Sequence, residues 1–241
     1  MHLDTGEKRS AYMVQRQENT PAAGLQFFGQ ISASISHELK NVLGIINENA
    51  GLLEDLTFMA DRGVPLDPVR LKAMAESVKK QVGRANAIIG NMNRFAHSAD
   101  RSIATVDLAQ TIDLALAVTA RFAVMRGVAL DLQLPENPVA LQTAPFFLIN
   151  LIWQCLEFSM SASGDERQIE MVAEAAQDGA RIRFGGLGGF SDTLLETFPS
   201  EREQHLLETL GADLTVAPER REMVLKLTNK EGSSTVRFIK Y

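Results

Sequence analysis

A long apolar seam near the start of the chain constrains its fold more than any other feature. From residue 25 to about residue 59, seam positions recur at alternating steps of three and four, and polar Glu38 and Asn49 occupy two of them. The apolar seam residues are Phe28, Ile31, Ile35, Val42, Ile45, Leu52 and Leu56. This heptad spacing predicts one long helix. A second apolar row suits a four-helix bundle better than a two-stranded coiled coil. That row consists of Leu39, Ile46 and Leu53.

A break and a second helical pattern follow the seam. Residues 61–65 read Asp-Arg-Gly-Val-Pro, and the glycine and proline predict the end of a helix. A new apolar stripe consists of Leu71, Met74, Val78, Ala85, Ile88, Met92 and Phe95. Two long helices joined by a short turn predict an antiparallel hairpin. One hairpin cannot bury both apolar rows, whereas two hairpins from two chains can, so we predict a homodimer built on a four-helix bundle.

The chain divides into a polar tail, the hairpin and a mixed C-terminal domain. We interpret residues 1–24 as the tail, 25–98 as the hairpin and 104–241 as the domain, with a boundary in the polar stretch 97–105. Helices are expected at 108–126, between Asp107 and Gly127 as caps, from Pro145 to about 160, and at 201–210. Strands are expected at 128–134, 139–143, 169–175, 181–185, 214–217, 222–228 and 235–239. This mixture predicts an α+β protein whose C-terminal part is an α/β sandwich with helices on one face of a sheet.

Composition argues against several partners and locations. The formal net charge of −6 disfavours nucleic acid, whose phosphates need a basic surface. No apolar run approaches the roughly 20 residues of a membrane-spanning helix, and the polar N-terminus lacks the apolar core of a secretion signal. The single cysteine, Cys155, cannot form an intrachain disulfide. These features predict a cytoplasmic protein that binds neither membrane nor nucleic acid.

The first helical pattern carries a histidine with the surroundings of a nucleophile. His37 lies two positions past the seam residue Ile35, so its side chain is expected to point away from the bundle axis. Glu38 is adjacent, and Asn41 lies one helical turn later on the same face. An imidazole attacks phosphorus through an unprotonated ring nitrogen, while a carboxylate holds the proton on the other nitrogen. The alternative interpretation is a solvated surface histidine.

The segment from Ser36 to Leu43 resembles the H-box of sensor histidine kinases. It reads Ser-His-Glu-Leu-Lys-Asn-Val-Leu, and it departs from the family pattern in having Val42 where proline is usual. The resemblance implies that His37 is the phosphorylated residue and that Glu38 is its acid/base partner. It also implies that Asn41 acts in dephosphorylating a partner receiver domain. With the hairpin and the C-terminal domain included, the resemblance covers residues 25–241.

The nucleotide-binding elements of the same family are degenerate here. Asn150 keeps the frame of the first element, but Gln154 replaces the asparagine that helps to hold magnesium. In the second element, Gly185 stands at the position of the adenine-reading aspartate, and Gly189 closes a glycine-rich run that we interpret as a remnant turn. The glycine lid of the third element is absent, because residues 198–203 lead directly into a helix. We therefore expect no bound ATP and no metal, and no Cys, His or carboxylate cluster has the spacing of a zinc site.

The sequence thus predicts a dimeric phosphorelay protein that resembles ATP-independent histidine phosphotransferases. It would accept a phosphoryl group on His37 from the aspartate of one response-regulator receiver domain and pass it to another. A receiver brings its own magnesium and aspartate, so no cofactor is expected. Two alternatives stay open: a divergent but active histidine kinase that uses ATP and Mg, and a non-catalytic dimeric scaffold or kinase regulator in which His37 is idle.

Overall fold

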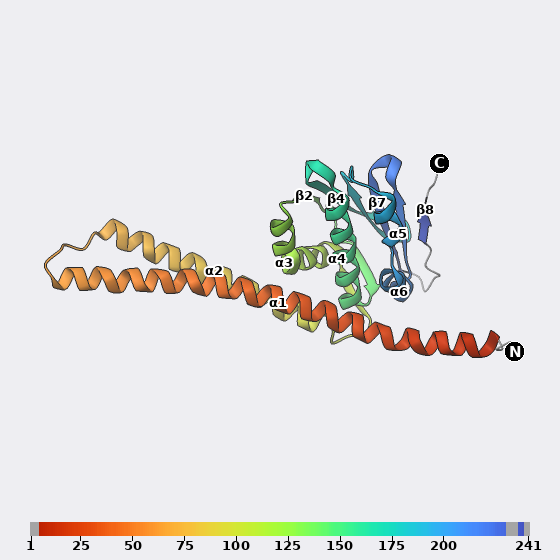
Figure 1. Ribbon diagram of the computed structural model, residues 1–241, viewed down its shortest axis with the longest axis horizontal. Helices are drawn as coiled ribbons and strands as arrows, with labels where there is room; N and C mark the ends of the chain where they lie inside the picture. The colour runs from red at the N-terminus through yellow and green to blue at the C-terminus, as the bar shows by residue number, and fades with distance from the viewer. Residues whose placement is uncertain (1–4, 230–235, 239–241) are drawn as a thin grey trace.

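The computed structural model describes residues 5–229 and 236–238, and its most prominent feature is a long helical hairpin (Figure 1). The C-terminal domain lies beside the open end of this hairpin, and the first helix continues past the domain toward the N-terminus. The helices are α1 (Thr5–Asp61), α2 (Pro68–His97), α3 (Leu108–Arg126), α4 (Pro145–Ala162), α5 (Asp192–Thr197) and α6 (Glu201–Leu210). The strands are β1 (Ala104–Asp107), β2 (Ala129–Gln133), β3 (Ala140–Thr143), β4 (Gln168–Ala176), β5 (Gly179–Gly185), β6 (Ala212–Ala217), β7 (Glu222–Thr228) and β8 (Val236–Phe238).

The hairpin has the predicted turn, but its first helix begins much earlier than residue 25. Helix α1 starts at Thr5, so most of the segment interpreted as a tail is helical. Apolar periodicity reports burial, and a polar segment made largely of good helix formers gives no such signal. Helix α2 begins with Pro68 as its first residue and Asp67 as its N-cap, whose side chain accepts a hydrogen bond from Val69 N at 2.9 Å. These features explain why the chain turns where it does.

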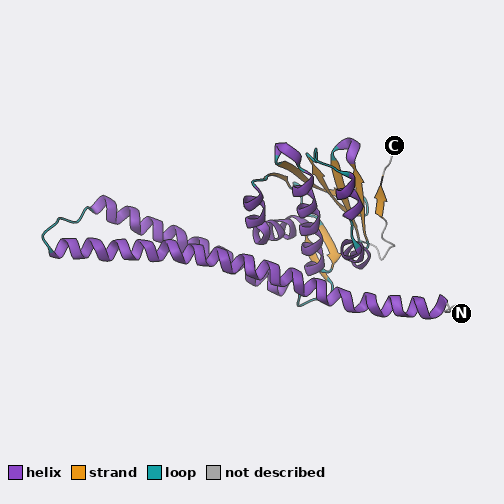
Figure 2. Cartoon of the chain, viewed as in Figure 1, coloured by secondary structure: helices purple, strands orange, loops and turns teal. Residues whose placement is uncertain are grey.

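The C-terminal domain is a six-stranded sheet in the order β2-β4-β5-β7-β6-β8, with helices on one of its faces (Figure 2). The outer pairs β2–β4 and β6–β8 are parallel, and the three inner pairs are antiparallel. A separate two-stranded sheet pairs β1 with β3. The predicted fold class, helices followed by a C-terminal α/β domain, is confirmed. Strand β1 and the short helix α5 were not predicted, and residues 235 and 239 of the last expected strand lie outside the described residues.

Helix α3 shows how local sequence sets an element's limits. Asp107 caps its start by accepting a hydrogen bond from Gln110 N at 2.9 Å, and Gly127 ends it in the left-handed conformation at φ 63°. With a mean hydropathy of 1.4, α3 is the one described helix that is long and apolar enough to be a candidate membrane span, contrary to the expectation from the sequence. Its contacts with α1, α2 and α4 account for this apolarity as that of a core helix.

An aromatic cluster joins the domain to the hairpin. Phe27 and Phe28 come from α1, Phe95 comes from α2, and Phe146 and Phe147 come from the first turn of α4. Ring centroids lie 5.5 Å apart for Phe27–Phe95 and 5.7 Å apart for both Phe27–Phe146 and Phe95–Phe146. Phe27 and Phe95 are completely buried. The hairpin and the domain therefore share one hydrophobic core at this junction.

Candidate functional site

The predicted histidine site lies on the exposed surface of the hairpin. His37 and Asn41 are both exposed on α1, one helical turn apart. The flanking seam residues Ile35 and Val42 are buried, which fixes the rotation of the helix and turns His37 outward. An exposed imidazole on a rigid helix is accessible to a partner protein, so the position suits a group that reacts with another macromolecule.

Glu38 faces the second helix of the hairpin. Its Oε2 lies 3.8 Å from the Arg84 guanidinium on α2, and its side chain is 18% exposed against 54% for Arg84. The pair holds the carboxylate of Glu38, the residue next to His37 in sequence, from the second helix of the hairpin. Because Arg84 is half exposed, this contact contributes little to stability, about 0–1 kcal/mol, and its main effect is to orient Glu38. Sequence reasoning missed Arg84, since pairing across a hairpin depends on a register that the sequence alone does not define.

The second polar seam position also bonds across the hairpin. Asn49 Nδ2 donates to Ile45 O at 2.7 Å and to Ser77 Oγ of α2 at 3.2 Å. Gln81 is also buried on α2, but its Oε1 has no hydrogen-bond partner among the described residues, so it adds nothing to this pairing. Polar groups in an otherwise apolar seam favour one register over its alternatives, because a shift would leave them unpaired. These contacts thereby hold Glu38 opposite α2.

The residues of the first nucleotide element bind to each other. Asn150 is completely buried on α4 and Gln154 nearly so. Gln154 Nε2 donates to Asn150 Oδ1 at 3.2 Å. In the described part of the chain, no group of three His, Cys, Asp or Glu side chains has the arrangement of a metal site. One hydrogen bond thus joins the two amides in the core of the domain, whereas Asn150 Nδ2 is buried and has no hydrogen-bond partner among the described residues.

The glycine at the aspartate position faces away from α4. Along β5, Ile182 and Phe184 are buried toward the helices, so Arg183 and Gly185 belong to the opposite face. A Cβ at Gly185 would lie 2.8 Å from Arg183 NH1 and 3.2 Å from Glu170 Oε2, and these two side chains already form an ion pair at 2.9 Å. An aspartate at this position would therefore point away from any ligand held against α4.

The glycine-rich run packs against the end of α4. Gly189 N donates to Ala162 O at 2.8 Å, and a Cβ at Gly189 would lie 2.8 Å from Gly164 Cα. Leu187 is completely buried, and its N–H donates to Arg221 O at 3.0 Å. The backbone donors at these positions are used within the protein, and the glycine at 189 is required by close backbone packing. The interpretation as a remnant turn agrees with these contacts.

A capped helix stands at the position of the missing lid. Ser200 and Glu203 form a capping box at the start of α6, in which Ser200 N donates to Glu203 Oε2 at 2.8 Å. Just before it, Phe198 stacks on Phe158 of α4, with ring centroids 4.0 Å apart and an interplanar angle of 15°. The sequence contained the Ser-x-x-Glu signature of the capping box, but nothing in it indicated the ring stacking.

A pocket of about 270 Å³ remains between α4 and the start of α6, here called the α4–α6 pocket. It is lined by Gln154, Glu157, Phe158, Ser161, Thr197, Phe198, Ser200 and Glu203. Two of these described residues are carboxylates and none is basic. Burial raises the pKa of the neighbouring Cys155 thiol, and the Glu203 carboxylate raises it further. Arg126 NH2 lies 3.0 Å from Glu157 Oε1 and neutralises one of the two carboxylate charges. A polyphosphate in this pocket would therefore meet the carboxylate of Glu203 without a compensating lining cation.

The other described histidines lie apart from His37. His97 ends α2 and is exposed, and its Nδ1 lies 2.8 Å from Asp100 Oδ2. His205 is on α6. Neither lines the α4–α6 pocket or the histidine site. His37, Glu38 and Asn41 thus lie within about one turn of α1, and their roles stay predictions. Asn150 and Gln154 bond to each other on α4, apart from the contacts of Gly185 and Gly189.

Comparisons with known proteins relate the sequence of this chain to that of a bacterial sensor protein. No family model matches the chain. In sequence it is 26% identical, over 197 residues, to the C4-dicarboxylate transport sensor protein DctB of Pseudomonas aeruginosa; the match covers 78% of this chain and 31% of DctB. The chain thus spans about a third of the length of this relative. Together with the H-box residues, this similarity supports a histidine-kinase-like protein of two-component signalling.

Solved structures resemble the chain more distantly. A bacterial phosphotransferase gives a TM-score of 0.46 at 17% identity, covering 83% of this chain and 95% of its own. The histidine kinase ThkA, solved in complex with response regulator protein TrrA, gives a TM-score of 0.45 at 12% identity, covering 95% and 69%. At such scores and identities we draw no functional conclusion from either structure.

Proposed function

We propose that this protein carries a phosphoryl group on His37 and exchanges it with the aspartate of response-regulator receiver domains, without ATP bound to its own C-terminal domain. One contrast carries the proposal. His37 is exposed next in sequence to Glu38, whose carboxylate contacts Arg84. The α4–α6 pocket, in contrast, is lined by two carboxylates and no basic residue, and Arg126 outside the lining is engaged by Glu157. The phosphoryl donor is then a second protein, which brings its own magnesium and aspartate, and this chain needs no cofactor.

The chemical step uses two side chains of this protein. The unprotonated ring nitrogen of His37 attacks the phosphorus of an aspartyl phosphate on the receiver. A P–N bond forms while the P–O bond to the aspartate breaks, and the aspartate leaves as a carboxylate with the bonding electrons. The imidazole gains positive charge, which Glu38 stabilises by accepting a hydrogen bond from the other ring N–H. The reverse reaction passes the group to a second receiver, and Asn41 orients water when a receiver is dephosphorylated instead.

The docking of the domain favours this role over that of an ATP-dependent kinase. In a kinase, the domain that holds ATP must bring the terminal phosphate to the histidine. Here the aromatic cluster anchors α4 at Phe27, which precedes His37 by ten positions on α1, or about 15 Å along a straight helix. Moving the domain toward His37 would separate buried aromatic rings from one another.

A second copy of the chain completes the molecule in this proposal. The hairpin exposes several large apolar side chains that its own domain does not cover: Leu43, Leu52, Leu53, Val82 and Ile89. Burying such a surface in a symmetric four-helix bundle is favourable, because apolar area is removed from water. The dimer would place two His37 residues on the outside of one bundle. We assign the protein to the cytoplasm, where its single buried cysteine stays reduced.

Phosphoryl transfer from a labelled receiver tests the proposal. Purified receiver domains from the same genome, phosphorylated with labelled acetyl phosphate, are incubated with the parent protein, with His37→Gln and with His97→Gln. We expect acid-labile label on the parent and on His97→Gln, and none on His37→Gln. Both histidines are exposed, so both variants should fold like the parent. Equal labelling of His37→Gln and the parent would contradict the assignment of His37, and a panel that labels no variant would favour the scaffold.

A further inference from the structure

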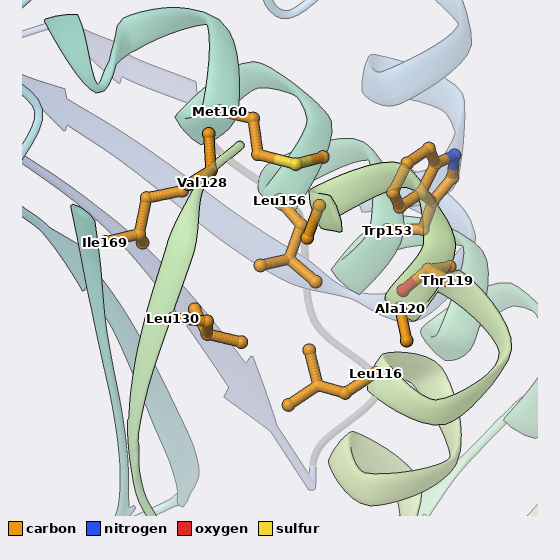
Figure 3. Close-up of a pocket in the computed structure, with 10 residues that line it drawn as sticks. Leu116, Thr119, Ala120, Val128, Leu130, Trp153, Leu156, Met160 and Ile169 are labelled. Carbon is orange, nitrogen blue, oxygen red and sulfur yellow. The ribbon is translucent and has the colours of Figure 1, made fainter. Parts of the chain in front are cut away.

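A second cavity lies in the C-terminal domain and shares no lining residue with the α4–α6 pocket (Figure 3). Its volume is about 220 Å³. Trp153, Leu156 and Met160 of α4 and Ile169 of β4 form its buried floor. The remaining walls come from α3 and from β2, the edge strand of the sheet, and the more exposed residues at these walls form the mouth. We call it the α3–β2 cavity.

The lining of the α3–β2 cavity is almost wholly apolar. Thr119 supplies its one hydroxyl, and Thr119 Oγ1 donates to Ala115 O of its own helix at 2.7 Å. The other polar side-chain group of the lining is Trp153 Nε1, which is buried and has no hydrogen-bond partner among the described residues. No described lining residue carries a charge. A charged ligand would therefore lose its water without gaining a partner. An uncharged apolar ligand would lose nothing of this kind and would gain contact on several sides.

The cavity is large enough to hold a small molecule. Protein interiors are packed about as densely as organic crystals, and voids larger than a water molecule are few. Apolar cavities of this order of size stay dry and bind small apolar molecules such as benzene. Water is a poor occupant here, because a buried water makes about three hydrogen bonds, and the lining side chains offer it only the oxygen of Thr119, whose hydrogen is used within the helix, and Trp153 Nε1.

We propose that the α3–β2 cavity is a binding site for a small, uncharged apolar molecule of one or two fused aromatic rings. The site is independent of the phosphoryl chemistry proposed for His37. Its position connects it to the hairpin, because α3 forms one wall and also packs on both helices of the hairpin. A ligand that fills the cavity would contact the helix on which the hairpin rests.

The cavity contains its own spectroscopic reporter. Trp153 is the single tryptophan of the chain, and it lies in the floor of the cavity next to Thr119 in Figure 3. Bromobenzene quenches indole fluorescence by contact through its heavy atom, so it serves as the probe. We expect saturable quenching and a rise in the melting temperature of the full chain, because a ligand that binds the folded state stabilises it. The charged analogue 4-bromobenzylamine should give neither effect at equal concentration.

Two matched substitutions on α3 locate the binding. Ala120 lines the cavity near its mouth, whereas Ala117 is exposed on the same helix and does not line it. Ala120→Leu should fill the space and weaken bromobenzene binding by about tenfold or more, and Ala117→Leu should leave it unchanged. Ala123→Leu, also at the lining, replaces Ala120→Leu if that variant does not fold. Absence of saturable quenching, or equal quenching in the Ala117 and Ala120 variants, would overturn the proposal.

Discussion

The histidine site and the α4–α6 pocket contain similar kinds of polar residue, but they differ in whether those residues are available to a partner molecule. At the first, His37 and Asn41 are exposed, and the neighbouring Glu38 is oriented by one partly solvated contact. At the second, several lining side chains are bound within the protein: Glu203 accepts from Ser200 N, Glu157 pairs with Arg126, and Gln154 donates to Asn150. Polar groups that satisfy each other in a core build stability, whereas polar groups left available on a rigid helix are free to react. The comparison supports our proposal that the hairpin is the reactive part of the molecule.

The largest stability effect should come from the junction that joins the two regions. Phe95→Ala removes a completely buried ring that contacts Phe27, Phe28 and Phe146. We expect the free energy of unfolding to fall by about 3–5 kcal/mol, from lost burial and the remaining cavity. Urea denaturation followed by circular dichroism measures it.

Phe58→Ala provides the matched control for this junction. Phe58 is 56% exposed near the far end of α1, where it stacks with Arg62 at 4.1 Å, and its loss should cost about 1 kcal/mol or less. If Phe95→Ala and Phe58→Ala cost the same, the two regions are not held together by the aromatic cluster, and the domain is free to move as in a kinase.

An effect of intermediate size on the free energy of unfolding should appear at alkaline pH. It reports whether solvent reaches Cys155 on α4. The pKa of the Cys155 thiol is raised in the folded state, so the folded protein keeps this proton after the unfolded chain, with a pKa of about 8.5, has lost it. Stability is thus fully present below about pH 8.5 and falls above it by about 1.4 kcal/mol per pH unit.

Between about pH 8 and about pH 10, the free energy of unfolding should therefore fall by roughly 2 kcal/mol more in the parent than in Cys155→Ala, as measured by urea denaturation. The substitution leaves the other titrating groups in place, so the difference isolates the thiol. Equal slopes for the two proteins would mean that solvent reaches this part of α4, as expected for an open nucleotide site rather than a packed remnant.

The smallest effect should come from the helix that replaces the missing lid. Ser200→Ala removes the hydroxyl of the capping box at the start of α6, and we expect a loss of about 1 kcal/mol in the free energy of unfolding. Ser161→Ala on the exposed side of α4 serves as the control, because Ser161 Oγ only donates to Glu157 O within its own helix. A neutral Ser200→Ala would indicate that this end of α6 is not fixed by its cap.

Much of this architecture was predictable because burial leaves a period in the sequence. The apolar seam from Phe28 to Leu56 predicted the first helix of the hairpin, and Asp107 and Gly127 predicted both ends of α3. The polar start of α1 at Thr5 had no such period, and strand β1 was hidden because its partner β3 is distant in the sequence.

The histidine site was similarly accessible to sequence reasoning, and the nucleotide elements were only partly so. His37, Glu38 and Asn41 are close in sequence, so a helix alone brings them together. The ion pair to Arg84 and the stacking of Phe198 on Phe158 join residues from different elements. The outward face of Gly185 depends on the strand register, which one residue of shift would invert.

Incubation with Mg and ATP labelled at the γ-phosphate tests the central claim most directly. The parent protein and His37→Gln are assayed side by side, with a labelled receiver as the alternative donor. We predict no acid-labile label on the parent from ATP, and label on the parent but not on His37→Gln from the receiver. Label that ATP places on the parent and that His37→Gln removes would contradict the account, because it would show that the C-terminal domain still delivers a phosphoryl group from nucleotide.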